Sequence, residues 1–134
     1  MKKYAIAIIG LVFAAFVLGS CDVSEIIKKG GTIRVTNKSE KYSVNIYITK
    51  SAYLEIDPTK PPSSYVVKKT IAANSTGDVS VGEDGIYYIN AFFNMPATSI
   101  TNAFEKRGTV DPIEKAVQTL AVGNTVSVDV KEIL

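Results

Sequence analysis

Hydrophobic and polar residues alternate along much of the chain, and this period of two predicts β-strands. The alternating segments are 32–36, 42–49, 65–71, 78–81, 86–93 and 125–131. In the segment 86–93, every second residue from Tyr87 to Phe93 is apolar, so we expect this set to face the core. Polar residues at 37–40 and 74–77 separate successive strands, and the first of these two turns predicts a hairpin.

The composition of the alternating region supports the same fold class. After residue 20 the chain has 13 Val and 12 Ile but only 3 Leu, and β-branched residues suit a pleated, half-buried surface. Lys68 and Lys69 mark the third strand as an edge strand, because lysines protect exposed edges from aggregation. We therefore expect an all-β domain over residues 32–134, a single antiparallel β-sandwich of about seven strands.

Residues 94–115 are irregular by pattern, and two interpretations of residues 111–122 are open. The run Asp111-Pro112-Ile113-Glu114 has the form of a helix start, with an acidic N-cap and a proline at the first helical position. Alternatively, 117–122 and 125–130 form a hairpin across Gly123-Asn124. We favour the hairpin, since the last strand needs a partner, and a short helical turn at 112–116 is compatible with it.

A local motif at the start of the predicted strand 86–93 resembles the tyrosine corner of immunoglobulin-like sandwiches. Glu83-Asp84-Gly85-Ile86-Tyr87 places an acidic residue, a glycine and a tyrosine at alternate positions. The resemblance implies that the Tyr87 hydroxyl bonds the backbone at a corner. Ile89 stands where antibody domains have cysteine, so the resemblance is to immunoglobulin-like or transthyretin-like sandwiches in general.

The first 21 residues resemble the signal peptide of bacterial lipoproteins. Two lysines precede an apolar run from Tyr4 to Leu18, which has the length of a signal-peptide core, and Leu18-Gly19-Ser20-Cys21 resembles the lipobox. The resemblance implies cleavage between Ser20 and Cys21 and attachment of acyl chains, such as palmitate, to Cys21. Residues 1–20 would then be the signal peptide and 21–31 a lipidated tether. The protein would be anchored in an envelope membrane, inner or outer, facing the extracytoplasmic side.

Charge and residue content exclude several classes of function. Without Lys2 and Lys3, 13 basic and 13 acidic side chains remain, which excludes a strongly basic nucleic-acid binder. The chain has no histidine, and its single cysteine, Cys21, would be lipidated, which together exclude histidine-based catalysis, thiol nucleophiles and histidine or cysteine metal sites. The acidic pairs Glu55/Asp57 and Glu83/Asp84 lie beside turns, and the second is only a weak candidate for Ca²⁺. We expect a monomer that is not an enzyme and has no cofactor or metal.

Aromatic residues on the polar side of the pattern are the remaining candidates for binding. Tyr47, Tyr88 and Phe92 fall on the outer face by alternation, and Tyr53 and Tyr65 flank a proline-rich loop at 57–64. Such rings offer apolar area to a protein or glycan partner. The alternative is that they pack under the long segment 94–115. The function we expect is a lipid-anchored extracytoplasmic binding module; the alternative is an accessory subunit of an envelope assembly.

Overall fold

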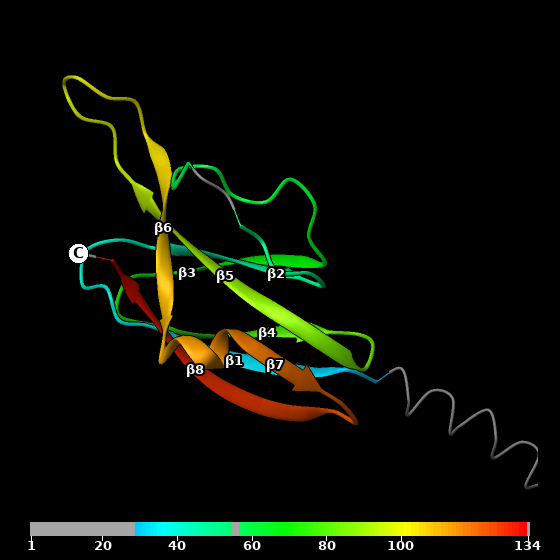
Figure 1. The fold of residues 1–134 in the computed structure, drawn as a ribbon. Helices are drawn as coiled ribbons and strands as arrows, with labels where there is room; N and C mark the ends of the chain where they lie inside the picture. Colours follow the sequence, from blue (N-terminus) through cyan, green and yellow to red (C-terminus); the bar gives the residue numbers. More distant parts are fainter. Residues whose placement is uncertain (1–28, 55–56, 134) are drawn as a thin grey trace, which may run out of the picture.

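The computed structural model describes residues 29–54 and 57–133, and these form an all-β fold (Figure 1). The expected fold class is therefore confirmed. The predicted signal peptide, Cys21 and most of the predicted tether lie outside the described residues. The strands are β1 (Gly31–Asn37), β2 (Val44–Thr49), β3 (Val67–Ile71), β4 (Thr76–Val81), β5 (Gly85–Met95), β6 (Phe104–Asp111), β7 (Val117–Leu120) and β8 (Asn124–Glu132), with one 3₁₀ turn, η1 (Ile113–Ala116).

All eight strands belong to one hydrogen-bonded sheet. The order along it is β3-β2-β5-β6-β8-β1-β4, and β7 adds to β5 beside this path. The two end strands, β3 and β4, follow one another in the chain and lie close together, so the sheet curls into a nearly closed, barrel-like shape (Figure 1). A sandwich of about seven strands is not confirmed, because β6 joins the two halves of the sheet by pairing with both β5 and β8.

The core lies inside this curled sheet. The apolar set on β5 faces it as predicted, with side chains 1–4% exposed at Tyr87, Ile89, Ala91 and Phe93. Val128 and Val130 of β8 are buried as well, and Tyr42 packs against the core from the segment before β2. The predicted edge position of β3 is also confirmed, since β3 ends the path.

The predicted hairpin at 37–40 is wrong. β1 pairs with β4 and in parallel with β8, whereas β2 pairs with β3 and β5, so residues 38–43 cross between the two halves. The fully buried Asn37 fixes this crossing. Its Nδ2 donates to the backbone oxygens of Tyr42, Ile71 and Ala72 at 2.9–3.2 Å. Asn37, which the sequence pattern assigned to a turn, is therefore a buried residue whose amide joins three backbone segments.

Residues 111–124 contain elements of both interpretations. η1 forms the short helical turn, although Pro112 occupies its N-cap and no side chain caps it. β7 is a strand, but it pairs with β5 and not with β8. The hairpin was predicted because β8 needed a partner; β1 and β6 fill that role.

The folded part begins earlier than the predicted boundary at residue 32. Gly31 is the first residue of β1, and Gly30 is buried with its backbone nitrogen 2.8 Å from Asp84 Oδ1. Gly30 has φ +69°, and a Cβ there would collide with the backbone oxygen of Val81. The two glycines predicted as tether are therefore part of the domain.

Candidate functional site: a cleft where β6 leaves β5

The candidate site lies at a fork in the sheet. Residues 92–95 of β5 pair with β6, and residues 85–88 pair with β7. Between these two ladders, no described residue of β6 or β7 pairs with Ile89, Asn90 or Ala91. From Gly108 onward β6 pairs with β8 instead, which opens the fork.

Gly108 allows β6 to change partners at this point. A Cβ at Gly108 would overlap the Phe93 ring and lie 2.7 Å from the backbone oxygen of Lys131. Any side chain would push β6 away from both neighbouring strands. Only glycine therefore permits the close crossing that shapes the fork.

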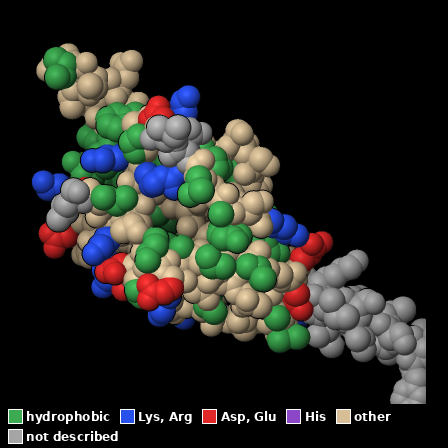
Figure 2. Space-filling view, viewed as in Figure 1, with side chains coloured by type: hydrophobic (Ala, Val, Ile, Leu, Met, Phe, Trp, Pro, Cys, Tyr) green, Lys and Arg blue, Asp and Glu red, His purple; other side chains and the backbone are tan. Residues whose placement is uncertain are grey.

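A cavity of about 410 Å³ occupies the fork, a volume typical of small-ligand sites. It is lined by Ala52, Tyr53, Leu54, Tyr88, Ile89, Asn90, Ala91, Arg107, Gly108, Thr109, Val110, Ile113, Ala116, Val117 and Ile133. Several apolar side chains at its border are exposed to solvent, with Leu54 90%, Ile113 64% and Val117 45% accessible. Figure 2 shows hydrophobic side chains gathered over the face that carries β5, η1 and β7. We call this cavity the fork cleft.

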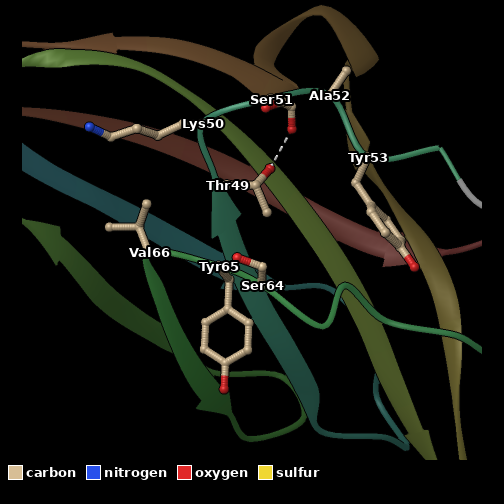
Figure 3. Close-up of a pocket in the computed structure, with 8 residues that line it drawn as sticks. All are labelled: Thr49, Lys50, Ser51, Ala52, Tyr53, Ser64, Tyr65 and Val66. Atoms are coloured by element: carbon tan, nitrogen blue, oxygen red, sulfur yellow. Dashed lines mark hydrogen bonds between the residues drawn. The ribbon is translucent and has the colours of Figure 1, made fainter.

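A second cavity, of about 400 Å³, adjoins the fork cleft and shares Ala52 and Tyr53 with it. It lies between residues 49–53 and 64–66, and Figure 3 shows Tyr53 and Tyr65 coming from these two arms. The first arm is held by a hydrogen bond of 2.7 Å from Thr49 Oγ1 to the backbone oxygen of Ser51 (Figure 3).

Three of the five predicted surface aromatics line these cavities, and two do not lie at the surface. Tyr53, Tyr65 and Tyr88 border the cavities. Tyr47 and Phe92 are 3% and 0% exposed, so their assignment to an exposed interaction surface is wrong. Their rings meet edge to face at 5.7 Å between centroids, under Tyr65, Glu105 and Arg107. Tyr47 and Phe92 therefore fit the alternative interpretation, in which the aromatic residues pack under residues 94–115. Tyr65 also covers Tyr47.

A polar network accompanies the buried aromatics on this face. Glu105 Oε1 accepts hydrogen bonds from the Tyr47 hydroxyl at 2.6 Å and from Asn45 Nδ2 at 2.7 Å. Asn45 Oδ1 in turn accepts from Thr70 Oγ1 at 2.6 Å and from Asn94 Nδ2 at 3.2 Å. Burial, followed by the bond to Glu105, raises the pKa of Tyr47 well above its ordinary value. Tyr47 is therefore a protonated donor at neutral pH.

Arg107 lines the fork cleft, and no carboxylate of the described residues forms an ion pair with its guanidinium. Its Cζ lies 4.9 Å from the Phe92 ring centroid and 5.4 Å from that of Tyr53. The guanidinium makes no hydrogen bond or ion pair with any described residue, and its Nη2 is buried without a partner. The sequence pattern did not identify Arg107 as a site residue. Residues 94–115 show no regular alternation, and Arg107 is not part of a recognisable motif.

The acidic residues near the tyrosine corner have structural roles. The Tyr87 hydroxyl donates to the backbone oxygen of Glu83 at 2.7 Å, which confirms the predicted corner bond. Asp84 Oδ1 accepts from the backbone nitrogens of Gly30 and Val122 at 2.8 and 3.1 Å. Among residues 29–54 and 57–133, no group of three or more acidic or cysteine side chains is arranged to hold a metal ion.

Comparisons with known proteins return no relative: no family model, curated protein or solved structure matches the chain. Within the part of the chain that the structure describes, no helix has the length and apolarity required to cross a bilayer.

Proposed function

We propose that this protein is a lipid-anchored extracytoplasmic binding module of the bacterial cell envelope, and that the fork cleft holds its ligand. The observation that carries the proposal is the cavity of about 410 Å³ whose border exposes apolar side chains beside an unpaired arginine. Exposed apolar area around a concave site is typical of a surface that meets a ligand. All residues that line the fork cleft belong to one chain, so we propose that the protein binds its ligand as a monomer.

Site-specific photo-cross-linking tests this proposal. A photoreactive residue is placed at Val117, at the border of the fork cleft, and in a second variant at Ser127, an exposed residue of β8 away from the cleft. We expect the full-length protein in intact cells to give a discrete adduct from position 117 only. Equal adducts from both positions, or none from 117, would reject the binding role. An adduct from position 127 alone, with a large envelope assembly, would favour the accessory-subunit alternative.

The proposed anchor rests on the lipobox-like Leu18-Gly19-Ser20-Cys21. Two acyl chains on Cys21 would suffice for stable membrane attachment. We expect Cys21→Ser to accumulate as an unprocessed, unacylated precursor, whereas Ser24→Ala, just beyond the motif, is processed normally. Intact-mass measurement decides the outcome: a wild-type membrane protein with a free thiol and no acyl mass would disprove the anchor.

We also propose that the fold is a modified immunoglobulin-like or transthyretin-like sandwich. Supporting this view, β1, β4 and β8 form one half and β2, β3, β5 and β7 the other, around a common core. The hydroxyl bond of Tyr87 is a further similarity. Amide hydrogen exchange tests this proposal: much weaker protection of β6 residues 104–107, which pair with β5, than of residues 108–111, which pair with β8, would support two separable halves. Equal protection of the two ladders would favour a closed barrel.

A further inference from the structure

Among the described residues, the guanidinium of Arg107 is the charged group that lines the fork cleft, and it has no hydrogen-bond or ion-pair partner there, which limits the chemistry of the ligand. A guanidinium offers five N–H donors and keeps its charge at all ordinary pH values. Buried polar atoms of native proteins are nearly always hydrogen-bonded, so a buried donor without a partner requires an explanation. Nη2 of Arg107 is the one buried side-chain nitrogen or oxygen of the described residues that lacks a partner.

From this we propose, extending the function proposed above, that the fork cleft binds small amphipathic carboxylates and that Arg107 recognises their carboxylate. The two aromatic rings of Tyr53 and Phe92 hold the guanidinium in place without neutralising it. A carboxylate can accept two parallel hydrogen bonds from such a group, which adds both affinity and orientation.

The other end of the cleft fits the body of such a ligand. Tyr88, Ile113 and Val117 provide apolar area in the lining of the cleft, and Leu54 adds a further exposed apolar side chain. Among the described residues, no carboxylate pairs with Arg107, so none would compete with the carboxylate of a ligand. The nearest acidic residue in sequence, Glu105, accepts hydrogen bonds from Tyr47 and Asn45 instead. A neutral polar ligand such as a sugar would leave both the charge and the apolar wall unused.

The inference is tested with matched probes that differ only in the head group. The probes are 3-phenylpropanoate, 3-phenylpropan-1-ol and 3-phenylpropylamine, titrated into the full-length protein in detergent micelles, with empty micelles as the blank. We expect the carboxylate to bind about 10-fold or more tighter than the alcohol, the range expected for hydrogen bonds to a charged group. We expect the amine to bind most weakly.

Variants at Arg107 distinguish recognition from a structural role. Arg107→Gln is expected to abolish the preference for the carboxylate while leaving the alcohol affinity unchanged, and Arg107→Lys to restore part of the preference. Lys106→Gln removes a neighbouring exposed charge and is expected to change neither affinity. Thermal unfolding shows whether each variant is folded.

Three outcomes would overturn the inference: equal binding of carboxylate and alcohol, equal loss of both in Arg107→Gln, or no binding of any probe to the wild type. None of them rejects the proposed binding role, which the cross-linking experiment at Val117 tests separately. Conversely, a carboxylate preference in the titrations without an adduct from position 117 in cells would retain the carboxylate site of the isolated protein and reject the proposed binding role in the envelope.

Discussion

β2 and residues 89–93 of β5 bury both of their faces, and the two faces differ in chemistry. The inner face is entirely apolar at Val44, Ile46 and Ile48 of β2. The outer face combines the aromatic rings of Tyr47 and Phe92 with amide groups and a carboxylate. The inner face is closed by other strands of the same sheet, whereas the outer face is covered by Tyr65 and by the β6 side chains of Glu105 and Arg107.

This difference explains why a single rule of alternation works for one face only. Alternation identifies the inner face because its residues cannot face water. The outer face contains polar residues whose hydrogen bonds are satisfied internally, so it is buried without being apolar throughout. The fork cleft opens where the cover of this outer face ends, which links the second face to the proposed function.

The largest effect that tests this comparison is expected from Phe92→Ala. Phe92 is fully buried on the outer face, so removal of its ring should cost ~3–5 kcal/mol of unfolding free energy, as it would in a core. Ile86→Ala, at a residue that is 57% exposed on the same strand, should change stability by about 0.5 kcal/mol or less. Urea unfolding of residues 29–134 measures both. A loss below about 1 kcal/mol for Phe92→Ala would mean that the outer face is open.

Gly108→Ala should destabilise the junction between the two halves by ~1–3 kcal/mol, because its Cβ would overlap the Phe93 ring. Gly82→Ala is the matched control, since a Cβ at that position meets no atom within 4 Å. The same urea titration compares them. Equal stability of the two variants would contradict the close crossing of β6.

Tyr47→Phe removes a hydroxyl donor to Glu105 and should cost ~1.5–3 kcal/mol at neutral pH, the range for bonds to charged groups. The pKa of Tyr47 is raised in the folded state, so above about pH 10 the unfolded chain ionises first. The stability of the wild type is therefore complete below that pH and falls as the pH rises further.

A pH series of unfolding between 8 and 11 tests this dependence. Tyr47→Phe should lose less stability than the wild type over the alkaline part of the series. If Tyr47→Phe and wild type lose stability in parallel, the phenol is not held protonated by its surroundings.

The sequence pattern predicted the inner face because local alternation and burial coincide there. It also predicted the corner bond of Tyr87, since the residues that form it are four apart in the chain. Strand pairing was less accessible. The parallel pairing of β1 with β8 joins residues more than 90 positions apart, and no local signal specifies such a partner.

The candidate site was only partly predictable for a related reason. Tyr53, Tyr65 and Tyr88 could be identified as surface aromatics from alternation and from the proline-rich loop. Arg107 could not, because its importance depends on which rings surround it and on the absence of an acidic partner among the described residues. β6 itself was missed, since a strand that changes partners at Gly108 does not keep one buried face along its length.

Tyr87→Phe should have a smaller effect, ~0.5–1.5 kcal/mol, because it removes one hydrogen bond between neutral groups and leaves the ring in the core. Tyr42→Phe is the control: a partly buried tyrosine packed against the same core, for which we expect a smaller loss. Equal losses in the two variants would mean that the corner bond adds nothing specific to stability.

The smallest effect is expected where the outer face of the sheet is uncovered, at the ion pair between Arg34 of β1 and Asp78 of β4. These residues are directly opposite in the ladder, with Arg34 Nε 2.9 Å from Asp78 Oδ1, and both side chains are about half exposed. The hydrogen bond from Arg34 lowers the pKa of Asp78, so the contribution of the pair is present above the ordinary aspartate value, near pH 4, and is lost as the pH falls through the lowered one. In unfolding experiments from pH 5 to pH 2, Asp78→Asn should therefore show a slightly shallower loss of stability than the wild type. Because water and salt screen an exposed pair, 1 M NaCl should reduce the difference further. A difference that persists in high salt, or that exceeds the effect of Tyr87→Phe, would mean that this outer pair is shielded from solvent and that the uncovered face resembles the covered one.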